Sequence, residues 1–379
     1  MPSPPLKTLL VHDWLTGMRG GEQVLEQLLQ LSPEAPIATL FHFPGSVSQE
    51  IESRTIVRSP IQYLPGLRRH YRYYLPLFPW AIERIDASAY RLVISVSHSV
   101  ARGIRKHPEA YHLCYCNSPM RYVWDQRRVY FPQPKGVIGR SREFILNRLQ
   151  AWDAATANRV DMFVANSHFV AKRIAVAYGV EAEVVHPPVQ CEDFHAAKQG
   201  ADQGYLVTVS ALVPYKRLDL AIAIAEASGR RLRIIGDGPE RPRLERLAAK
   251  SQAHVQFEGR IPRTQVVDLV RQASAFIQPG IEDFGISSVE ALAAGIPVVA
   301  HETGGAKDIV RPNVDGVLVA NYDLNSWVSA IDRAVEMRSN YLDRMAHAEQ
   351  FSSAHFRAGI EDILRRRPTS KPIEGMQRS

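Results

Sequence analysis

Short apolar runs alternate along the chain with longer stretches in which apolar residues recur every three or four positions. The short runs predict buried strands, and the periodic stretches predict amphipathic helices. In the first half, strands are predicted at 8–12, 92–96, 111–116, 161–165 and 183–186. Helices are predicted at 20–31 and 138–157, and from the cap Asn166-Ser167 to Tyr178.

The second half of the chain repeats this alternation. Strands are predicted at 205–210, 232–235, 254–257 and 275–278, and helices at 240–249, 263–273, 324–337 and 355–366. Strands that alternate with helices at this spacing are typical of parallel sheets with helices on both faces. Each half therefore has the elements of one doubly wound, Rossmann-like α/β sheet.

Length and local composition predict the domain boundaries. A chain of 379 residues is too long for one ordinary hydrophobic core, so two domains are expected. Pro187-Pro188 and the polar, poorly patterned stretch 189–204 predict a linker. We expect domains at 1–188 and 189–354, a helix at 355–367 that crosses back to the first domain, and a disordered tail at 368–379.

Basic residues are concentrated in one part of the first domain. Residues 51–150 hold 17 Lys and Arg against 6 Asp and Glu. No nucleic-acid-binding signature accompanies them, which disfavours nucleic acid as a partner. Within 61–86, aromatic, apolar and arginine side chains crowd together, as suits the headgroup layer of a membrane; alternatively, the aromatic residues pack in a core while the arginines face water. We expect peripheral contact of 61–86 with an anionic membrane.

The remaining composition predicts a cytoplasmic protein. No run of eighteen apolar residues occurs, and Met1-Pro-Ser-Pro-Pro5 does not resemble a signal peptide. Cys114 and Cys116 alternate onto one face of a predicted strand, and Cys191 stands alone. A C-x-C pair without a second pair favours buried packing over a metal site. Together with the membrane contact, this predicts a location at the inner face of the cell membrane.

The stretch from Gly280 to Ala300 carries the most chemical information. An apolar run ends at Pro279, a loop follows, Ala291 to Ala294 favour a helix, and Gly295 and Pro297 end it before another apolar run. In such a strand–loop–helix–strand unit the loop lies at the carboxyl edge of a parallel sheet, where ligands bind. The amides of the helix start, Phe284 to Ser288, favour an anion such as phosphate.

Two carboxylates flank this anion site. Glu282 lies in the loop and Glu290 lies one turn inside the helix. Carboxylates accept hydrogen bonds from hydroxyls, so the combination suggests a ligand with both phosphates and sugar diols. An alternative is structural, because Ser287-x-x-Glu290 is also a capping box, in which Glu290 binds the cap amide.

The motif Glu282-x7-Glu290, with Phe284-Gly285 inside it and Ala291-Leu-Ala-Ala-Gly295 after it, resembles the signature of the retaining family 4 glycosyltransferases of the GT-B fold. The resemblance implies two Rossmann-like domains that face a cleft and a nucleotide-sugar donor. It implies catalytic roles for Glu282 and Lys216. It also implies donor contacts from Lys216 and from Gly20, Gly21, Arg260, Ile261, Phe284, Gly285, Ile286, Ser287 and Glu290.

The tips of the first-domain strands complete the predicted site. His98 follows one strand and is expected to line the site as a third catalytic residue. The runs Val11 to Glu22 and Pro119 to Asp125 resemble the mannosyltransferases that build bacterial polysaccharides, which implies GDP-mannose. The residues expected on the acceptor or sugar side are Asp13, Asn117 and Arg121.

Two positions depart from the family pattern. The family has an arginine five residues before Lys216, where this chain has Ala211, and a histidine where this chain has Asn117. Loss of the arginine should weaken stabilisation of the leaving phosphate by a few kcal/mol unless a neighbour such as Arg217 compensates. The departures are compatible with a slow enzyme, an altered donor or a silent homologue.

The expected function is therefore metal-independent transfer of a hexose, with retention, to a lipid-linked or polysaccharide acceptor. No Asp-x-Asp metal motif occurs, so Lys216 is expected to balance the charge of the leaving diphosphate, and no cofactor is expected. Two alternatives are a GT-B sugar-nucleotide 2-epimerase and a weak or silent homologue that serves as a nucleotide-sugar-binding scaffold.

Overall fold

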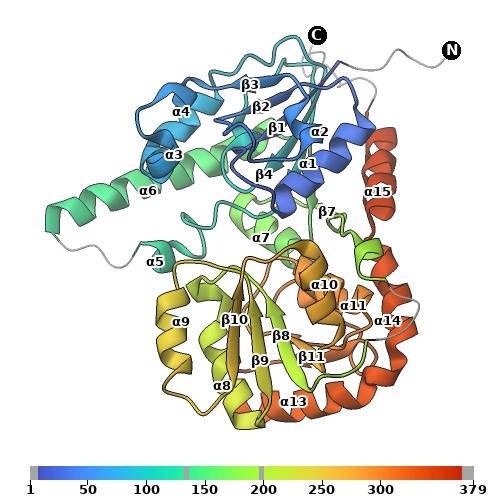
Figure 1. Cartoon of the computed structure of the whole chain (residues 1–379). Helices are drawn as coiled ribbons and strands as arrows, with labels where there is room; N and C mark the ends of the chain where they lie inside the picture. Colours follow the sequence, from blue (N-terminus) through green and yellow to red (C-terminus); the bar gives the residue numbers. More distant parts are fainter. Residues whose placement is uncertain (1–6, 132–135, 196–199, 369–379) are drawn as a thin grey trace. The chain divides into compact units, whose positions relative to one another are not determined.

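The computed structural model describes residues 7–131, 136–195 and 200–368. The chain divides into two compact units (Figure 1). Unit 1 comprises residues 1–166, 171–185 and 356–379, and unit 2 comprises residues 167–170 and 186–355. The first boundary expected from the sequence, at 188, lies three residues beyond the one that contacts define. The tail expected at 368–379 falls, apart from Pro368, outside the described residues.

Unit 1 is built on a seven-stranded parallel sheet in the order β3-β2-β1-β4-β5-β6-β7. The strand order reverses between β1 and β4, which pair from Thr8 and Leu92 to His12 and Val96. The strands are β1 (Thr8–His12), β2 (Ile37–Thr39), β3 (Ile56–Arg58), β4 (Leu92–Ser97), β5 (Tyr111–Cys116), β6 (Met162–Ala165) and β7 (Glu183–Val184).

Helices cover both faces of this sheet, because alternate strand residues enter two different cores. Leu10, Ile94 and Leu113 pack with α1, α2 and α15, whereas Leu9, Val11 and Val93 pack with α3, α4 and α6. The helices are α1 (Gly20–Leu31), α2 (Gln49–Glu52), α3 (Leu67–His70), α4 (Phe78–Ile82), α5 (Arg127–Tyr130), α6 (Gly136–Thr156), α7 (His168–Tyr178) and α15 (Ser353–Arg366).

The last helix, α15, packs in unit 1. Phe356 meets the ring of Tyr115 edge-on at 5.5 Å, and Arg357 donates to Gln30 on α1 at 2.9 Å. Arg366 forms an ion pair with Glu183 at 2.7 Å. These contacts place the end of the described chain on the same sheet as its beginning.

Unit 2 has a six-stranded parallel sheet in the order β10-β9-β8-β11-β12-β13. Its order reverses between β8 and β11, where Leu206 pairs with Ala275. The strands are β8 (Tyr205–Val209), β9 (Arg231–Ile235), β10 (Val255–Gly259), β11 (Ala275–Gln278), β12 (Val298–His301) and β13 (Gly316–Val319).

The two faces of the second sheet are covered by different helices, which Figure 1 shows around the strands. Leu206, Ile234 and Ile277 pack with α8, α9 and α13, and Val207, Phe276 and Val298 pack with α10 and α11. The helices are α8 (Leu218–Ser228), α9 (Arg241–Ala248), α10 (Arg263–Arg271), α11 (Ile286–Ala293), α12 (Ala306–Ile309), α13 (Leu324–Glu336) and α14 (Tyr341–Ala348).

The predicted linker is wrong for residues 189–195. Val189, Cys191 and Phe194 are almost fully buried in the core of unit 2, and the Cys191 thiol lies 3.3 Å from the carbonyl oxygen of Ala348. Burial raises the pKa of Cys191 to about 12. A few apolar residues thus fix a stretch whose overall composition is polar. Residues 196–199 lie outside the described part of the chain.

The structure also bears on membrane-spanning helices, on the paired cysteines and on the shortest strands. Among the helices of the described residues, none combines the length and the hydropathy that a membrane span needs. Cys114 and Cys116 are both buried, in agreement with the predicted packing role. The short strands β2 and β3 were absent from the sequence prediction, because three-residue strands give no readable periodicity.

Candidate functional site

In unit 2, Lys216 and Glu282 form an ion pair where the strand order reverses. Lys216 ends a short turn, Pro214–Lys216, that follows β8, and Glu282 lies in the loop between β11 and α11. Each side chain is 15% exposed. Ligands of doubly wound sheets bind at this kind of position, because the loops of adjacent strands separate there. The pair thus places a cation and a carboxylate at the carboxyl edge of the sheet, where the sequence predicts the ligand site. Both groups are largely shielded from water.

Close backbone packing holds the Glu282 loop. A Cβ atom at Gly280 would lie 2.6 Å from the Lys216 Cα and from the Tyr215 carbonyl oxygen. One at Gly304, whose φ is +111°, would lie 2.5 Å from the Glu282 carbonyl oxygen. The Gly305 amide donates to that same oxygen at 3.0 Å. Only glycine fits at positions 280 and 304, so the loop is held between two neighbouring loops.

The start of α11 depends on a buried glutamine. Gly285 precedes the helix with φ +112°, and a Cβ there would lie 3.0 Å from Gln278 Oε1. Ser288 Oγ donates to the same oxygen at 2.8 Å. The first helical amides, those of Ile286 and Ser287, have no preceding turn to bond to, as at every helix start. They are available for an anion.

The capping-box interpretation of Glu290 is wrong. The helix begins at Ile286 with Gly285 as its cap, so Ser287 is already inside the first turn. The Glu290 Oε1 atom accepts instead from Nη1 of Arg263, the first residue of α10, at 2.5 Å. Burial raises the pKa of Glu290, and the Arg263 charge opposes this rise.

The other predicted donor contacts are spread around this loop. Phe284 is buried, and its ring stacks on His186 with the ring centres 5.4 Å apart, so only its backbone is available to a ligand. Arg260, just after β10, is exposed, and Ile261 packs partly buried against the core under α10 and α11. Unit 2 thus brings Lys216 and Glu282 into contact, with Glu290 following on α11.

In unit 1, the expected acceptor role of Asp13 is wrong. Its side chain is fully buried, and its two carboxylate oxygens accept hydrogen bonds from four successive amides, those of residues 98–101, at 2.6–3.0 Å. A fully buried carboxylate that is held by four amides is out of reach of a substrate hydroxyl. Asp13 instead fixes the loop after β4.

Asp13 also orients His98. His98 Nδ1 lies 3.0 Å from Asp13 Oδ2, and the ring is edge-on to Trp14 with centres 4.7 Å apart. Burial lowers the pKa of His98, and the Asp13 carboxylate opposes this shift. A neutral His98 that donates from Nδ1 keeps the lone pair of Nε2 as an acceptor. The side chain is 35% exposed, so this acceptor is available to a ligand.

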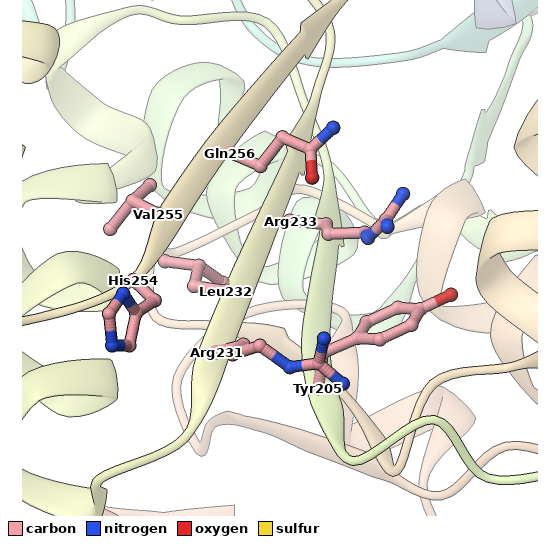
Figure 2. Close-up of a pocket in the computed structure, with 7 residues that line it drawn as sticks. All are labelled: Tyr205, Arg231, Leu232, Arg233, His254, Val255 and Gln256. Atoms are coloured by element: carbon pink, nitrogen blue, oxygen red, sulfur yellow. The ribbon is translucent and has the colours of Figure 1, made fainter.

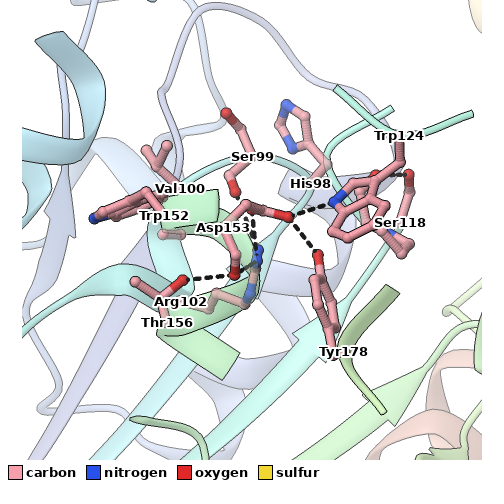
Figure 3. Close-up of polar contacts among 12 residues, drawn as sticks. His98, Ser99, Val100, Arg102, Ser118, Trp124, Trp152, Asp153, Thr156 and Tyr178 are labelled. Carbon is pink, nitrogen blue, oxygen red and sulfur yellow. Dashed lines mark hydrogen bonds and ion pairs between the residues drawn. The ribbon is translucent and has the colours of Figure 1, made fainter. Parts of the chain in front are cut away.

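A buried polar network supports the His98 loop from below (Figure 3). Arg102 and Asp153 are both fully buried and form an ion pair at 2.5 Å. Arg102 donates to the Ser99 carbonyl oxygen at 3.2 Å. The second Asp153 oxygen accepts from Trp124 Nε1 at 2.8 Å and from the Tyr178 hydroxyl at 2.9 Å. The network ties α6 and α7 to the loop that carries His98.

Gly20 and Gly21 begin α1, as predicted. A Cβ at Gly21 would lie 3.2 Å from His12 Nε2 and 3.4 Å from Asn117 Nδ2, so Asn117 does reach the start of this helix. Arg121 is half-buried, and its Nε donates to Ser118 Oγ at 3.2 Å. Unit 1 therefore gathers Gly21 and Asn117 beside His12, whose ring centre lies 6.3 Å from that of His98.

Arg217 does not take the place of the missing arginine. Ala211 is exposed after β8. Arg217 adopts a left-handed backbone, φ +51°, and its guanidinium lies over the Tyr322 ring, 4.7 Å from the ring centre. Its Nε contacts Asp219 at 3.2 Å. With these partners, Arg217 is directed to α8 and Tyr322 instead of to Lys216.

A separate hollow of about 250 Å³ lies on β8, β9 and β10 (Figure 2). It contains none of the residues predicted for the site. Within the described ranges, no group of three or more His, Cys, Asp and Glu side chains could hold a metal ion. The residues that line the hollow are Tyr205, Arg231, Leu232, Arg233, His254, Val255 and Gln256.

Sequence reasoning missed the residues that support the site. Arg263 lies 27 positions before its partner Glu290, and Gln278 lies inside an apolar strand, so neither has a local signal. Gly304-Gly305 did carry one, because paired glycines mark a close backbone approach. Asp13 was singled out for the wrong reason.

Comparison with known structures defines the fold. Sucrose-phosphate synthase from Thermosynechococcus elongatus superposes with a TM-score of 0.70 at 16% identity, over 95% of this chain and 98% of that one. Anabaena HepE in complex with UDP and glucose gives 0.69 at 16% identity, over 96% and 100%. The galactosyltransferase WaaB of the lipopolysaccharide outer core gives 0.67 at 15% identity, over 95% and 99%. This chain has the GT-B fold.

Sequence comparison concerns mainly the second half of this GT-B protein. Residues 191–351 match the family model of glycosyl transferases group 1. The D-inositol 3-phosphate glycosyltransferase of Mycolicibacterium smegmatis is 30% identical over 221 residues, which are 52% of this chain and 51% of that protein. That of Mycobacterium tuberculosis H37Ra is 29% identical over 223 residues, 52% and 46%. The chain thus spans about half the length of the curated relatives that it matches.

Proposed function

We propose that this protein is a retaining glycosyltransferase that moves a hexose from a nucleotide sugar to a lipid-linked or polysaccharide acceptor. The observation that carries the proposal is the Lys216–Glu282 pair at the strand-order reversal of unit 2, followed directly by the open amides of α11. The match of residues 191–351 to glycosyl transferases group 1 covers all of these residues. This match supports a glycosyltransferase over a sugar-nucleotide 2-epimerase, which needs no acceptor.

The chemistry follows from the charges that these groups present. Negative charge accumulates on the diphosphate as the glycosidic bond breaks, and the Lys216 ammonium and the α11 amides stabilise it. Glu282 orients the donor sugar through its hydroxyls. The leaving phosphate accepts the proton of the attacking acceptor hydroxyl on the same face, which retains the anomeric configuration. His98 Nε2 accepts a hydrogen bond from a sugar hydroxyl.

For the donor we propose GDP-mannose. Support comes from the resemblance of Val11 to Glu22 and Pro119 to Asp125 to polysaccharide mannosyltransferases. The Anabaena structure is a complex with UDP and glucose, so UDP-glucose is the donor to compare with it. Thermal shifts with GDP-mannose, UDP-glucose and ADP-glucose test the choice, because a ligand stabilises the state that it binds. The largest shift with GDP-mannose is expected, and a larger one with either other donor would overturn this assignment.

For the surroundings we propose the inner face of the cell membrane. In the segment 61–86, Tyr63, Tyr73 and Trp80 expose 79%, 82% and 46% of their surface. Arg68, Arg69, Arg72 and Arg84 are exposed beside them, and Arg84 lies over the Trp80 ring at 5.3 Å. Exposed aromatic rings with neighbouring guanidinium groups favour an anionic lipid surface. At this surface the protein would meet a lipid-linked acceptor.

A second candidate function is a weak or silent nucleotide-sugar-binding scaffold. It is favoured by Ala211 and by the partners of Arg217, which leave Lys216 without the second cation of the family pattern. Donor turnover by the native protein and by Ala211→Arg separates the candidates. We expect turnover by both, with the variant about tenfold or more faster. Turnover by Ala211→Arg but not by the native protein would show that the native chain serves as a scaffold.

A further inference from the structure

The Glu282 loop, residues 279–285, is bonded to a residue that lies 116 positions before its partner in the loop. The hydroxyl of Ser167 donates to the carbonyl oxygen of Asp283 at 2.5 Å, and Ser167 is fully buried. Residues 167–170 belong to unit 2, although the residues on either side of them belong to unit 1. This short segment is thus part of the unit that contains the Glu282 loop.

The same hydroxyl also caps helix α7. Ser167 directly precedes His168, the first residue of α7, and its Oγ accepts from the amide of Val170 at 3.1 Å. A serine hydroxyl has one proton and two lone pairs, so it can accept from the helix while it donates to the loop. One buried side chain therefore satisfies an amide of α7 and a carbonyl oxygen of the Glu282 loop.

Asp308 fixes the first amide of α7. Its Oδ2 accepts from the His168 amide at 2.7 Å, and the Asp308 side chain is only 8% exposed. Asp308 lies in α12, and Gly305, which caps that helix, donates its amide to the Glu282 carbonyl oxygen at 3.0 Å. The first turn of α7 is thus bonded both to the Glu282 loop and to the helix that holds this loop from its other neighbour.

These bonds set the direction of the peptide groups in the Glu282 loop. A peptide group is planar, so its carbonyl oxygen and the following N–H point in opposite directions. Ser167 binds the carbonyl oxygen of Asp283 and thereby directs the N–H of Phe284 to the opposite side. That amide is the first of those expected to bind phosphate at α11. The hydroxyl of Ser167 therefore fixes a ligand-binding amide from behind.

We propose that Ser167 is a positioning residue for the Glu282 loop and that the first turn of α7 responds to nucleotide binding at this loop. The inference rests on the proposed function, because it assumes that a diphosphate binds at the amides that follow Asp283. It goes further in giving residues 167–170 a part in binding. Coupling of this kind is reciprocal. A loop that binds nucleotide more tightly when Ser167 holds it must strengthen the Ser167 contact once nucleotide is bound.

The first experiment measures the Kd of GDP and of UDP by titration calorimetry with the full chain. Ser167→Ala should raise the Kd of the tighter-binding nucleotide about 3- to 10-fold, because a buried hydrogen bond that orients the loop is lost. Ser167→Thr keeps the hydroxyl and should restore the Kd to within about twofold of the native value.

The matched control is Asp323→Ala, which removes a helix cap elsewhere in unit 2. Asp323 caps α13, and its carboxylate accepts from the Ser326 amide at 2.9 Å. Among the residues that the structure describes, this carboxylate has no hydrogen bond to the Glu282 loop. Asp323→Ala should therefore keep the native Kd of both nucleotides.

Hydrogen exchange in the native protein tests the coupling without any substitution, so the proposal can be judged even if Ser167→Ala folds poorly. The amides of residues 168–170 should exchange at least about threefold more slowly with saturating nucleotide than without it. The amides of residues 324–326, at the start of α13, should keep their exchange rates.

The outcomes separate this inference from the proposed function. If nucleotide binds but exchange at residues 168–170 does not slow, or if folded Ser167→Ala binds as tightly as the native protein, the inference alone is overturned. Equal weakening by Ser167→Ala and Asp323→Ala also overturns it, because loss of any helix cap would then have the same effect. A native protein that binds neither GDP nor UDP overturns the inference and the proposed function together.

Discussion

Lys216 and Glu282 show how one residue pair carries the proposed chemistry. They come from loops 66 positions apart, and glycines at 280 and 304 allow the backbones to approach. In the absence of ligand each charge balances the other. Binding of a diphosphate supplies a new partner for the lysine and leaves the carboxylate for sugar hydroxyls. The pair is thus suited to a donor that carries both groups.

Removal of the lysine should abolish most of the activity. We expect Lys216→Ala to lower kcat by about 10²- to 10³-fold, because one well-placed donor to developing charge contributes roughly 3 kcal/mol. Steady-state turnover of the best donor is the measurement. The control is Lys106→Ala, since Lys106 forms a similarly shielded pair with Asp161 at 2.6 Å in unit 1. A kcat in Lys216→Ala within threefold of the control would contradict the assigned role.

A buried histidine gives unit 1 a specific acid sensitivity. His112 is fully buried, with Nε2 at 2.8 Å from Ser95 Oγ and Nδ1 at 3.3 Å from the Arg159 carbonyl oxygen. Burial lowers the pKa of His112 to about 3. In the unfolded chain the imidazole takes up a proton near pH 6.5, whereas in the folded protein it stays neutral to a much lower pH. The contribution of His112 to the free energy of unfolding is therefore fully present above pH 6.5 and is lost as the pH falls toward 3.

Replacement of His112 should weaken the dependence of the stability on pH. Between pH 6.5 and 4 the free energy of unfolding of the native protein should fall relative to that of His112→Gln by about 1.4 kcal/mol per pH unit at most. Urea titrations of both proteins at several pH values give the difference. Parallel stability curves for the two proteins would rule out His112 as the titrating group.

At the scale of elements, the position of His98 depends on helices far away in sequence. The loop after β4 is held by Asp13 from β1's end and by Arg102, which is paired with Asp153 on α6. Tyr178, at the end of α7, bonds the same carboxylate. Elements from four parts of the chain thus determine one loop. The order of strands and helices could be predicted from the sequence, but this support could not.

Breaking the buried pair should destabilise unit 1 strongly. Asp153→Asn leaves the Arg102 charge without its counter-charge in a fully buried place, at a cost of about 3–5 kcal/mol. The measurement is the midpoint of urea unfolding. Asp161→Asn provides the comparison, because the Asp161 side chain is 20% exposed and should lose clearly less stability. Equal losses in the two variants would show that burial does not set the cost.

At the scale of the whole molecule, the exposed aromatic residues of 61–86 should determine membrane attachment. Tyr63→Ser, Tyr73→Ser and Trp80→Ser together remove rings that expose 79%, 82% and 46% of their surface. We expect binding to vesicles with 30% anionic lipid to weaken at least about tenfold, as measured by sedimentation. The matched control is Val176→Ser with Leu342→Ser, two exposed apolar residues outside the segment. Equal binding by both variants would refute the assignment.

The sequence by itself determined the succession of elements and the motif of the site. Hydrophobic periodicity is local, so strands such as Thr8–His12 and Ala275–Gln278 and the helix Gly20–Leu31 could be predicted to the residue. Glu282 and Glu290 were found from their spacing, and Lys216 from resemblance. Very short strands and the packed segment 189–195 were missed, because a few buried side chains outweigh local composition there.

The tertiary structure alone decided which groups face one another. In the folded protein Asp13 is buried and bound by four backbone amides. Glu290 pairs with Arg263 instead of capping its helix, and Arg217 lies over the ring of Tyr322. Each of these is a contact between residues distant in the chain, and a linear pattern contains no information on such distances. The sequence therefore identifies the candidate site residues, and the tertiary structure determines which of them can contact a ligand.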